Sequence, residues 1–276
     1  MNTSQAFIEL VRKRTSIRKY SDQSFEAQEF KEILNLFKEL ETGLFGSKIR
    51  YKLISNLDEQ AETRFGTYGF ISGAQYYIAG AVNQNPMAFI DFGYNTEKLI
   101  LALTGLNLGT CWLGGTFSRG QFAEEINLQE NELLPCITPV GYATESRGLR
   151  EKLIRFGAKS DTRLPFETLF LNTETNTISD DFIQMLECVR MAPSASNKQP
   201  WRLVVTDNQF GFYLKRTAGY GKFTPGNDLQ QVDMGIALAH FTGAAEAFGY
   251  TFTISNGSNM EILPEMEAVA EVVLSK

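Results

Sequence analysis

Hydrophobic and polar residues follow two patterns along the chain, and these patterns predict helices and strands. Apolar residues spaced three and four apart, as in Phe30, Ile33, Leu34 and Phe37, are typical of a helix with one buried face. This spacing predicts helices over residues 6–13, 30–40, 90–106, 182–192 and within 232–251. Short apolar runs bounded by polar or glycine-rich stretches predict strands over residues 51–55, 76–82, 133–142, 203–206 and 210–216.

The predicted elements repeat in the order helix, strand, strand, helix, strand. The helices FKEILNLFKEL and FIQMLECVRMA begin 152 positions apart, at Phe30 and Phe182. The two long helices open with the same pattern, apolar-Asp-apolar-Gly, at Asp91 and Asp233. This order favours an internal duplication with a pseudo-twofold shape, although two similar α/β layers could also arise by coincidence. Residues 143–161 are basic and irregular, and they are the best candidate for the connection between halves.

Composition narrows the class of protein. The 276 residues carry a formal net charge of −6, which argues against a general nucleic-acid binder that neutralises phosphates with Lys and Arg. The sequence contains no run of about 18 apolar residues, the length needed to cross a membrane, and the N-terminus does not resemble a secretory signal. Three widely spaced cysteines suit a reducing compartment. We therefore expect a cytoplasmic protein with no membrane or nucleic-acid partner.

The segment RTSIRKY places Arg14, Ser16 and Arg18 at alternate positions. In an extended chain, alternate side chains project to one side. Two guanidiniums and a hydroxyl on one side are suited to a phosphate, because Arg presents paired donors to phosphate oxygens. The alternative is a solvated basic turn at a helix C-terminus, where cations are favoured in any case.

Two further segments have the composition of ligand-binding loops. APSASNKQPW combines small residues, which let a flat ligand approach the backbone, with polar side chains such as Ser194 and Asn197. TCWLGG ends in two glycines that let main-chain N–H groups come close to a ligand. The alternatives are a Pro-Ser turn before a strand with Trp201 in the core, and a plain turn.

The sequence lacks the motifs that most other kinds of catalysis require. The glycine-rich stretches at 66–74 and 219–227 have neither Walker nor G-x-G-x-x-G spacing, and G-x-S-x-G is absent. The single histidine, His240, rules out a His-rich metal site, and its alanine-rich helical surroundings favour a hydrogen-bonded packing role over catalysis. No metal site is expected. Any chemistry should therefore come from a cofactor.

The strings RTSIRKY, APSASNKQPWRLVV and LGTCWLGG, followed by TPVGY, together resemble the nitroreductase family of FMN enzymes. The whole chain looks like the branch in which two half-units are fused in tandem. In ordinary members, each FMN site combines the RxSxR stretch of one subunit with the PSxxNxQPW loop of the other. Here the first half has ETGLFGSKIRY in place of the loop, and the second has YTFTIS in place of TCWLGG. The resemblance therefore implies one composite FMN site per chain.

The resemblance also implies an architecture. It is an α+β fold of two repeated half-units, each with a central, mostly antiparallel sheet flanked by helices, with the long helices at the pseudo-twofold interface. The halves would comprise residues 1–172, including the connection, and residues 173–276, intertwined around the shared site.

Site residues follow from the same resemblance. The FMN phosphate and ribityl chain would be held by Arg14, Ser16 and Arg18, with the backbone of Thr15. The flavin ring would be lined by Leu113, Gly114 and Gly115, and reached from the second half by Pro193, Ser194, Ala195, Ser196 and Asn197. Arg163 is favoured to complete the phosphate site, with Arg147, Arg150, Lys152 and Arg155 as alternatives.

The implied activity is an FMN-dependent oxidoreductase. NADPH or NADH would pass hydride to FMN, and a nitroaromatic, quinone or similar small-molecule acceptor would take the electrons, with no essential protein acid or base. A second hypothesis is a flavin-binding or regulatory protein that keeps the pocket without turnover, and a third is a specialised member acting on a halogenated or flavin substrate. Because one chain supplies both half-units, we expect a monomer that acts as a pseudo-dimer.

Overall fold

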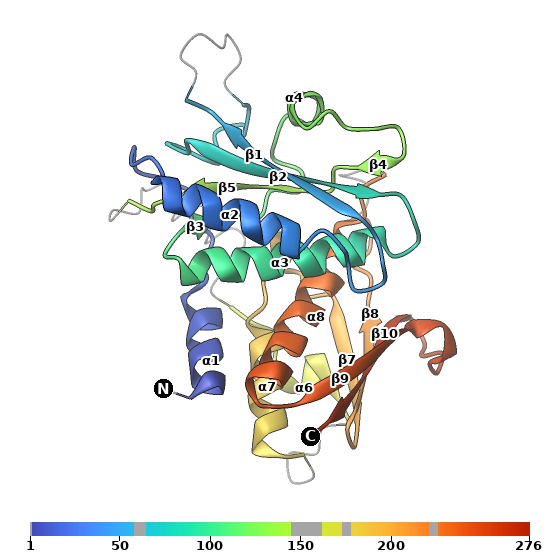
Figure 1. Cartoon of the computed structure of the whole chain (residues 1–276). Helices are drawn as coiled ribbons and strands as arrows, with labels where there is room; N and C mark the ends of the chain where they lie inside the picture. The colour runs from blue at the N-terminus through green and yellow to red at the C-terminus, as the bar shows by residue number, and fades with distance from the viewer. Residues whose placement is uncertain (1, 58–64, 145–161, 173–177, 221–225) are drawn as a thin grey trace.

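Two five-stranded sheets are joined through a pair of long helices in the computed structural model (Figure 1). The structure describes residues 2–57, 65–144, 162–172, 178–220 and 226–276. In the view of Figure 1 the first sheet lies above and the second below, and α3 and α8 cross between them. Both helices are buried on nearly every side, and apolar residues predominate in both.

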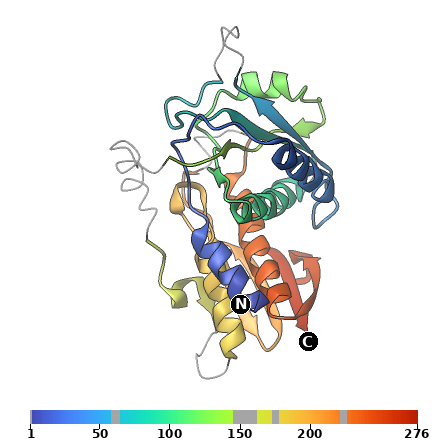
Figure 2. The ribbon, with the colours of Figure 1, turned by 60° about the vertical axis from the view of Figure 1, so that its left-hand side comes forward.

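The first half contains the following elements: α1 (Thr3–Lys13), α2 (Ala27–Glu39), β1 (Ile49–Ser55), β2 (Tyr76–Asn83), α3 (Ala88–Gly105), β3 (Gly109–Thr110), α4 (Arg119–Glu125), β4 (Glu132–Leu133) and β5 (Ile137–Gly141). Helix α1 begins where the Asn2 side chain accepts from the N–H of Gln5, and Glu26 and Glu29 form a capping box at the start of α2. Helix α1 contacts α3 and α8 and lies beside α8 in both views (Figures 1 and 2).

The rest of the chain builds the second sheet and its helices: α6 (Phe166–Leu169), β6 (Phe170–Leu171), α7 (Asp180–Arg190), η1 (Ala195–Asn197), β7 (Trp201–Thr206), β8 (Gln209–Leu214), α8 (Leu229–Ala247), β9 (Thr251–Asn256), η3 (Gly257–Asn259) and β10 (Glu267–Ser275). Ser179 and Asp228 cap α7 and α8 through their side-chain oxygens. Each cap provides a hydrogen-bond acceptor for an N–H group in the first turn, which has no acceptor within the helix itself.

The two sheets share one strand order. The first runs β1-β2-β5-β3, with β4 also paired to β2, and the second runs β6-β7-β8-β10-β9. Strands β1 and β2 thus correspond to β7 and β8, and β5 and β3 correspond to β10 and β9. All pairings between these strands are antiparallel except that of β6 with β7. Strand β6, from the end of residues 1–172, therefore extends the sheet of the second half.

Helices α3 and α8 form the interface between the halves through reciprocal glycines. A Cβ atom placed on Gly93 would lie 2.1 Å from the carbonyl oxygen of Val232, and one on Gly235 would lie 2.0 Å from that of Ile90. The helix backbones touch at these two points, where only glycine fits. Such reciprocity, in which each side offers the same residue to the other, is the contact pattern of a twofold interface.

The predicted helices and most predicted strands are present, with shifted ends. The strand predicted over residues 133–142 is wrong in its extent, because the chain forms β4 and β5 separated by Leu134, Pro135 and Cys136. Pro135 cannot donate to a ladder, and its carbonyl oxygen accepts instead from the Asn227 amide at 2.8 Å. The acidic stretch around Glu124 and Glu125 lies in α4. Strand β10 was not predicted.

Apolar side chains form one large buried cluster around α8 and two smaller ones around the first sheet. None of the helices in the described ranges is both long enough and apolar enough to cross a membrane.

Candidate active site

The RTSIRKY segment leaves α1 and runs extended along β3. The N–H of Arg14 ends the helix by donating to the carbonyl of Leu10, and the N–H of Ile17 donates to the carbonyl of Thr110 at 2.8 Å. The extended backbone turns Ile17 toward Gly109, where a Cβ would lie only 2.8 Å from the Ile17 side chain. Arg14, Ser16 and Arg18 all line one cavity, as their alternate spacing predicts.

This cavity measures about 390 Å³, within the range of small-molecule sites. Both halves contribute to its walls. The first half supplies Val11, Arg12, Arg14, Thr15, Ser16, Arg18, Trp112, Gly114 and Cys136. The remaining wall consists of Arg163, Met191, Pro193, Ser194, Ala195, Ser196, Asn197, Leu229, Val232, Asp233 and Ile236. Residues far apart in the sequence therefore face one space.

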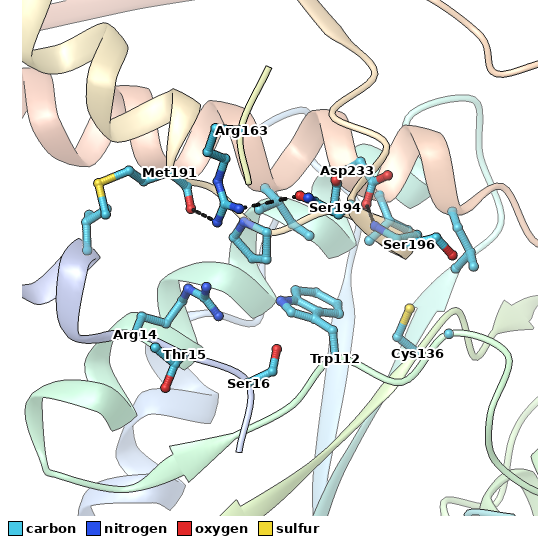
Figure 3. A pocket seen from close by; sticks show the side chains of 18 of the residues that line it. Arg14, Thr15, Ser16, Trp112, Cys136, Arg163, Met191, Ser194, Ser196 and Asp233 are labelled. Atoms are coloured by element: carbon cyan, nitrogen blue, oxygen red, sulfur yellow. Dashed lines mark hydrogen bonds between the residues drawn. The ribbon is translucent and has the colours of Figure 1, made fainter. Parts of the chain in front are cut away.

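One side of the cavity is strongly cationic. Arg14 and Arg163 lie together on the same side as Ser16, whereas Asp233 and Cys136 lie on the other, with Trp112 between them (Figure 3). The Arg14 side chain is 8% exposed, and neither its Nε nor the Nη1 of Arg18 has a hydrogen-bond partner in the described ranges. Buried donors of this kind are unfavourable unless an acceptor is supplied. This side therefore suits an anion with several oxygen atoms.

Beneath the cationic side, Glu97 holds Arg14 and Trp112 in place. Its Oε1 lies 3.8 Å from the Nε of Arg14, and its Oε2 accepts from the indole N–H of Trp112 at 2.7 Å. Oε1 also lies 2.9 Å from the Nε2 of His240, whose Nδ1 lies 2.9 Å from the carbonyl oxygen of Cys188. Because a carbonyl oxygen only accepts, the Nδ1 of His240 is the donor in the bond to Cys188. The hydrogen-bonded packing role expected of His240 is confirmed.

The loop from the second half is strained and tightly held. Ser196, Asn197 and Gln199 have φ values of +50°, +54° and +48°, a region that non-glycine residues seldom adopt. The carboxamide oxygen of Gln199 accepts from the N–H of Leu164 at 2.9 Å, and the Asn197 amide donates to the carbonyl of Thr162 at 3.0 Å. Strain of about 1–3 kcal/mol per residue persists only where such contacts impose it, and it is concentrated at binding sites.

Arg163 lies where the loop meets the cationic side. Its guanidinium donates to the carbonyl of Met191 at 3.1 Å and to the Asn197 side chain at 3.5 Å. It is thus fixed within the cavity wall. The alternatives Arg147, Arg150, Lys152 and Arg155 lie outside the described residues.

The opposite side of the cavity holds two buried titratable groups. Burial raises the pKa of the Cys136 thiol, which keeps it neutral and unreactive. Burial also raises the pKa of Asp233 well above its ordinary value, against the lowering effect of a hydrogen bond from the N–H of Ala195. No cluster of His, Cys, Asp or Glu side chains in the described ranges could hold a metal ion.

Eleven of the thirteen expected site residues line the cavity, and two do not. Leu113 does not line the cavity: its side chain is 3% exposed and packs in the first-half core, because the extended chain turns Trp112 to the cavity and Leu113 away. Gly115 is exposed and does not line the cavity either. Gly114 is placed as expected, and a Cβ there would lie 2.7 Å from Leu229 of α8.

Trp112 and Asp233 are two of the nine cavity residues that the sequence-based expectations missed. Trp112 lies within the string TCWLGG, and strand alternation alone could have separated it from Leu113. Asp233 belongs to the repeated helix opening, which was interpreted only as evidence of duplication. Its counterpart Asp91 offers a direct comparison, because it lies against a loop rather than in the cavity.

These features define a class: an α+β protein with two like sheets and one small-molecule cavity built from both halves. A family model described as "Putative TM nitroreductase" matches residues 6–245. The chain therefore belongs to this nitroreductase family. Membership indicates an oxidoreductase in general terms.

The chain is also similar to solved structures. The chain is similar to a "putative nitroreductase" from Thermotoga maritima, with 20% identity, a TM-score of 0.64 and coverage of 99% of this chain and 94% of that one. A nitroreductase family protein from Clostridium difficile matches at 20% identity and a TM-score of 0.43, over 63% of this chain and 96% of its own. A nitroreductase with bound FMN from Bacteroides fragilis matches at 17% identity and a TM-score of 0.40, over 52% of this chain and 91% of its own. No curated protein matches the sequence. The first similarity confirms the expected nitroreductase-like α+β fold.

Proposed function

We propose that this chain is an FMN-dependent oxidoreductase that takes hydride from NADPH or NADH and passes electrons to a nitroaromatic, quinone or similar acceptor. The observation that carries the proposal is the cavity in which the RTSIRKY segment of the first half faces the loop 193–197 of the second. The combination of these two segments around one flavin is what the resemblance implied.

The cationic side fits the FMN phosphate. Arg14 and Arg18 each offer a buried nitrogen with no hydrogen-bond partner in the described ranges, and a phosphate supplies acceptor oxygens in the paired geometry that guanidinium prefers. Ser16 adds a hydroxyl, and Arg163 adds a third guanidinium on the same side of the cavity. Glu97 would keep Arg14 oriented when the phosphate is absent. These residues would hold the phosphate and the ribityl chain.

The rest of the cavity fits a flat aromatic ring. Trp112, Leu229, Val232 and Ile236 provide apolar surface, and Gly114 exposes its main chain. Bound flavin supplies the redox chemistry by accepting a hydride and returning electrons to a second substrate. The protein binds the ring, orients it and excludes water from the apolar side. Because Cys136 is kept neutral and His240 is buried behind Glu97, neither side chain takes part.

A tandem duplication would explain why one chain completes the site. An origin in two like half-units is supported by three features: the equal strand order, the reciprocal glycines at α3 and α8, and the addition of strand β6 to the second sheet. We infer that the protein is a monomer acting as a pseudo-dimer. Gel filtration with light scattering tests this inference, and a stable dimer would contradict it.

The test of function begins with the purified chain and added FMN. We expect tight FMN binding, an oxidised flavin spectrum, and bleaching of that spectrum by NADPH or NADH in the absence of oxygen. Arg14→Ala should raise the Kd for FMN by about 10- to 100-fold, since it removes hydrogen bonds to a charged group worth about 1.5–3 kcal/mol.

The matched control is Lys52→Ala. Lys52 forms an exposed ion pair with Glu125 away from the cavity, so FMN affinity should not change. Failure of the wild-type chain to bind FMN would overturn the proposal. Bound FMN that neither nicotinamide reduces would instead favour a flavin-binding protein without turnover.

A further inference from the structure

Asp233 has a buried oxygen atom without a hydrogen-bond partner. It lies near the start of α8, lines the cavity and is 2% exposed. Its Oδ1 accepts from the N–H of Ala195 at 2.9 Å, whereas its Oδ2 has no hydrogen-bond partner in the described ranges. A buried carboxylate oxygen without a donor is strongly disfavoured, so an explanation in terms of a ligand is required.

Asp91, at the matching position of α3, shows the contrast. It is fully buried, and its two oxygens accept from the N–H groups of Phe45 and Ser47 and from the Ser47 hydroxyl. The first-half loop thus satisfies its aspartate completely. The second-half loop donates once and leaves the other oxygen of Asp233 on the cavity wall. The difference lies in the loop, since both aspartates occupy the same place in the helix opening.

The surroundings of Asp233 favour a neutral carboxyl group. The nearby titratable groups in the described ranges are Asp228 on the same helix, Cys136 before β5 and Tyr220 after β8. Asp228 adds negative charge, and burial raises the pKa values of both Cys136 and Tyr220, so that none of the three supplies a positive charge. Arg14 and Arg163 lie on the opposite side of the cavity (Figure 3). A neutral carboxyl has an O–H to donate.

We propose that Asp233 is a cofactor-binding residue that donates a hydrogen bond from its Oδ2 hydroxyl to a carbonyl oxygen or ring nitrogen of the flavin ring. The N–H of Ala195 fixes Oδ1, so the hydroxyl has one direction left to donate. With the phosphate at the cationic side, a flavin ring in the rest of the cavity would reach the side that carries Asp233. The inference rests on the proposed FMN function. Its consequence is a bond that strengthens as the ring gains electrons on reduction.

Two substitutions distinguish a donor from a carboxylate. Asp233→Asn keeps an acceptor for the N–H of Ala195 and replaces the hydroxyl by an N–H donor, so the Kd for FMN should stay within about threefold. Asp233→Ala removes both, and the Kd should rise about tenfold. The flavin midpoint potential should fall in the alanine variant and stay near the wild-type value in the asparagine variant. Fluorescence titration and dye-equilibration photometry measure the two quantities.

The pH dependence provides a further readout. As pH rises through the folded-state pKa of Asp233, ionisation would replace the donor with a negative charge, so wild-type FMN affinity should fall while that of Asp233→Asn stays constant. Asp91→Asn is the positional control, and where it folds it should leave the Kd and the potential unchanged. Circular dichroism checks folding of each variant.

The outcomes separate this inference from the proposed function. No FMN binding by the wild-type chain would end both. Binding of FMN with equal Kd and potential in wild type, Asp233→Asn and Asp233→Ala would overturn the role of Asp233 alone. An asparagine variant as weak as the alanine variant would also overturn it, because the carboxyl would then act as an acceptor. Changes confined to the KM of the electron acceptor would assign Asp233 to the second substrate instead.

Discussion

The loops that face Asp91 and Asp233 occupy the same position in the two halves, but only the loop beside Asp233 leaves a cavity next to its aspartate. In the first half, Gly43 lies so close to Asp91 that a Cβ would be 2.3 Å from the aspartate Cβ, and Leu44 and Phe45 pack into the core. In the second half, the loop around Ala195 leaves a cavity beside Asp233. The comparison shows that one scaffold position can support either packing or ligand binding, depending on the loop placed against it.

The largest effect should come from the part that both halves share. Gly93→Ala and Gly235→Ala each drive a methyl group into a backbone carbonyl of the opposite helix, and each should lower the free energy of unfolding by about 3 kcal/mol. Gly105→Ala is the control, because its nearest neighbour is 4.0 Å away and alanine favours a helix. Urea denaturation measures all three. Unequal costs at Gly93 and Gly235 would contradict a reciprocal interface.

A smaller effect should separate the two aspartates. Asp91→Ala leaves two buried N–H groups and a hydroxyl without an acceptor, and it should cost about 2–3 kcal/mol of stability in the protein without ligand. Asp233→Ala leaves only the N–H of Ala195 without an acceptor and should lower the free energy of unfolding by about 1 kcal/mol. Equal losses in urea denaturation would remove the distinction between a structural and a binding aspartate.

The distinction should also depend on pH. The pKa of Asp233 is raised in the folded state, so this state keeps its proton where the unfolded chain has lost it. Stability linked to Asp233 is therefore complete below the ordinary aspartate pKa of about 4 and declines as pH rises toward the folded pKa. Asp233→Asn should remove this decline. Without ligand, the free energy of unfolding of the variant should therefore rise relative to that of the wild type between pH 4 and 7. A constant difference across this range would show that Asp233 is ionised when folded.

The smallest effects concern the backbone of the two loops. Gly46 has a φ of +92° with open space around it, and Gly46→Ala should cost about 1 kcal/mol. Ser196 adopts a φ of +50° without being glycine, so Ser196→Gly should relieve strain and stabilise the protein by about 0.5 kcal/mol. Thermal unfolding with a fixed FMN concentration would show whether the relieved loop also binds FMN less tightly.

The sequence predicts what local periodicity controls. Alternate positions in RTSIRKY placed Arg14, Ser16 and Arg18 on one cavity, and the helix openings anticipated α3 and α8. The alternation within TCWLGG separates Trp112 from Leu113, and Pro135 marks the break in the strand expected over residues 133–142. The Asn227 amide that donates to the carbonyl of Pro135 approaches only after folding. The environment of Asp233 could not be predicted, because it depends on which N–H groups a loop 38 residues away in sequence presents.

The crossing of α3 and α8 is encoded within a single polypeptide. When two identical subunits meet, every substitution appears on both sides of the axis at once. Here a change near Asp91 leaves Asp233 untouched, and the crossing forms at any protein concentration, because its partners cannot diffuse apart. Each side of the interface can therefore change independently of the other, whereas Gly93 and Gly235 remain constrained because the two helix backbones meet there.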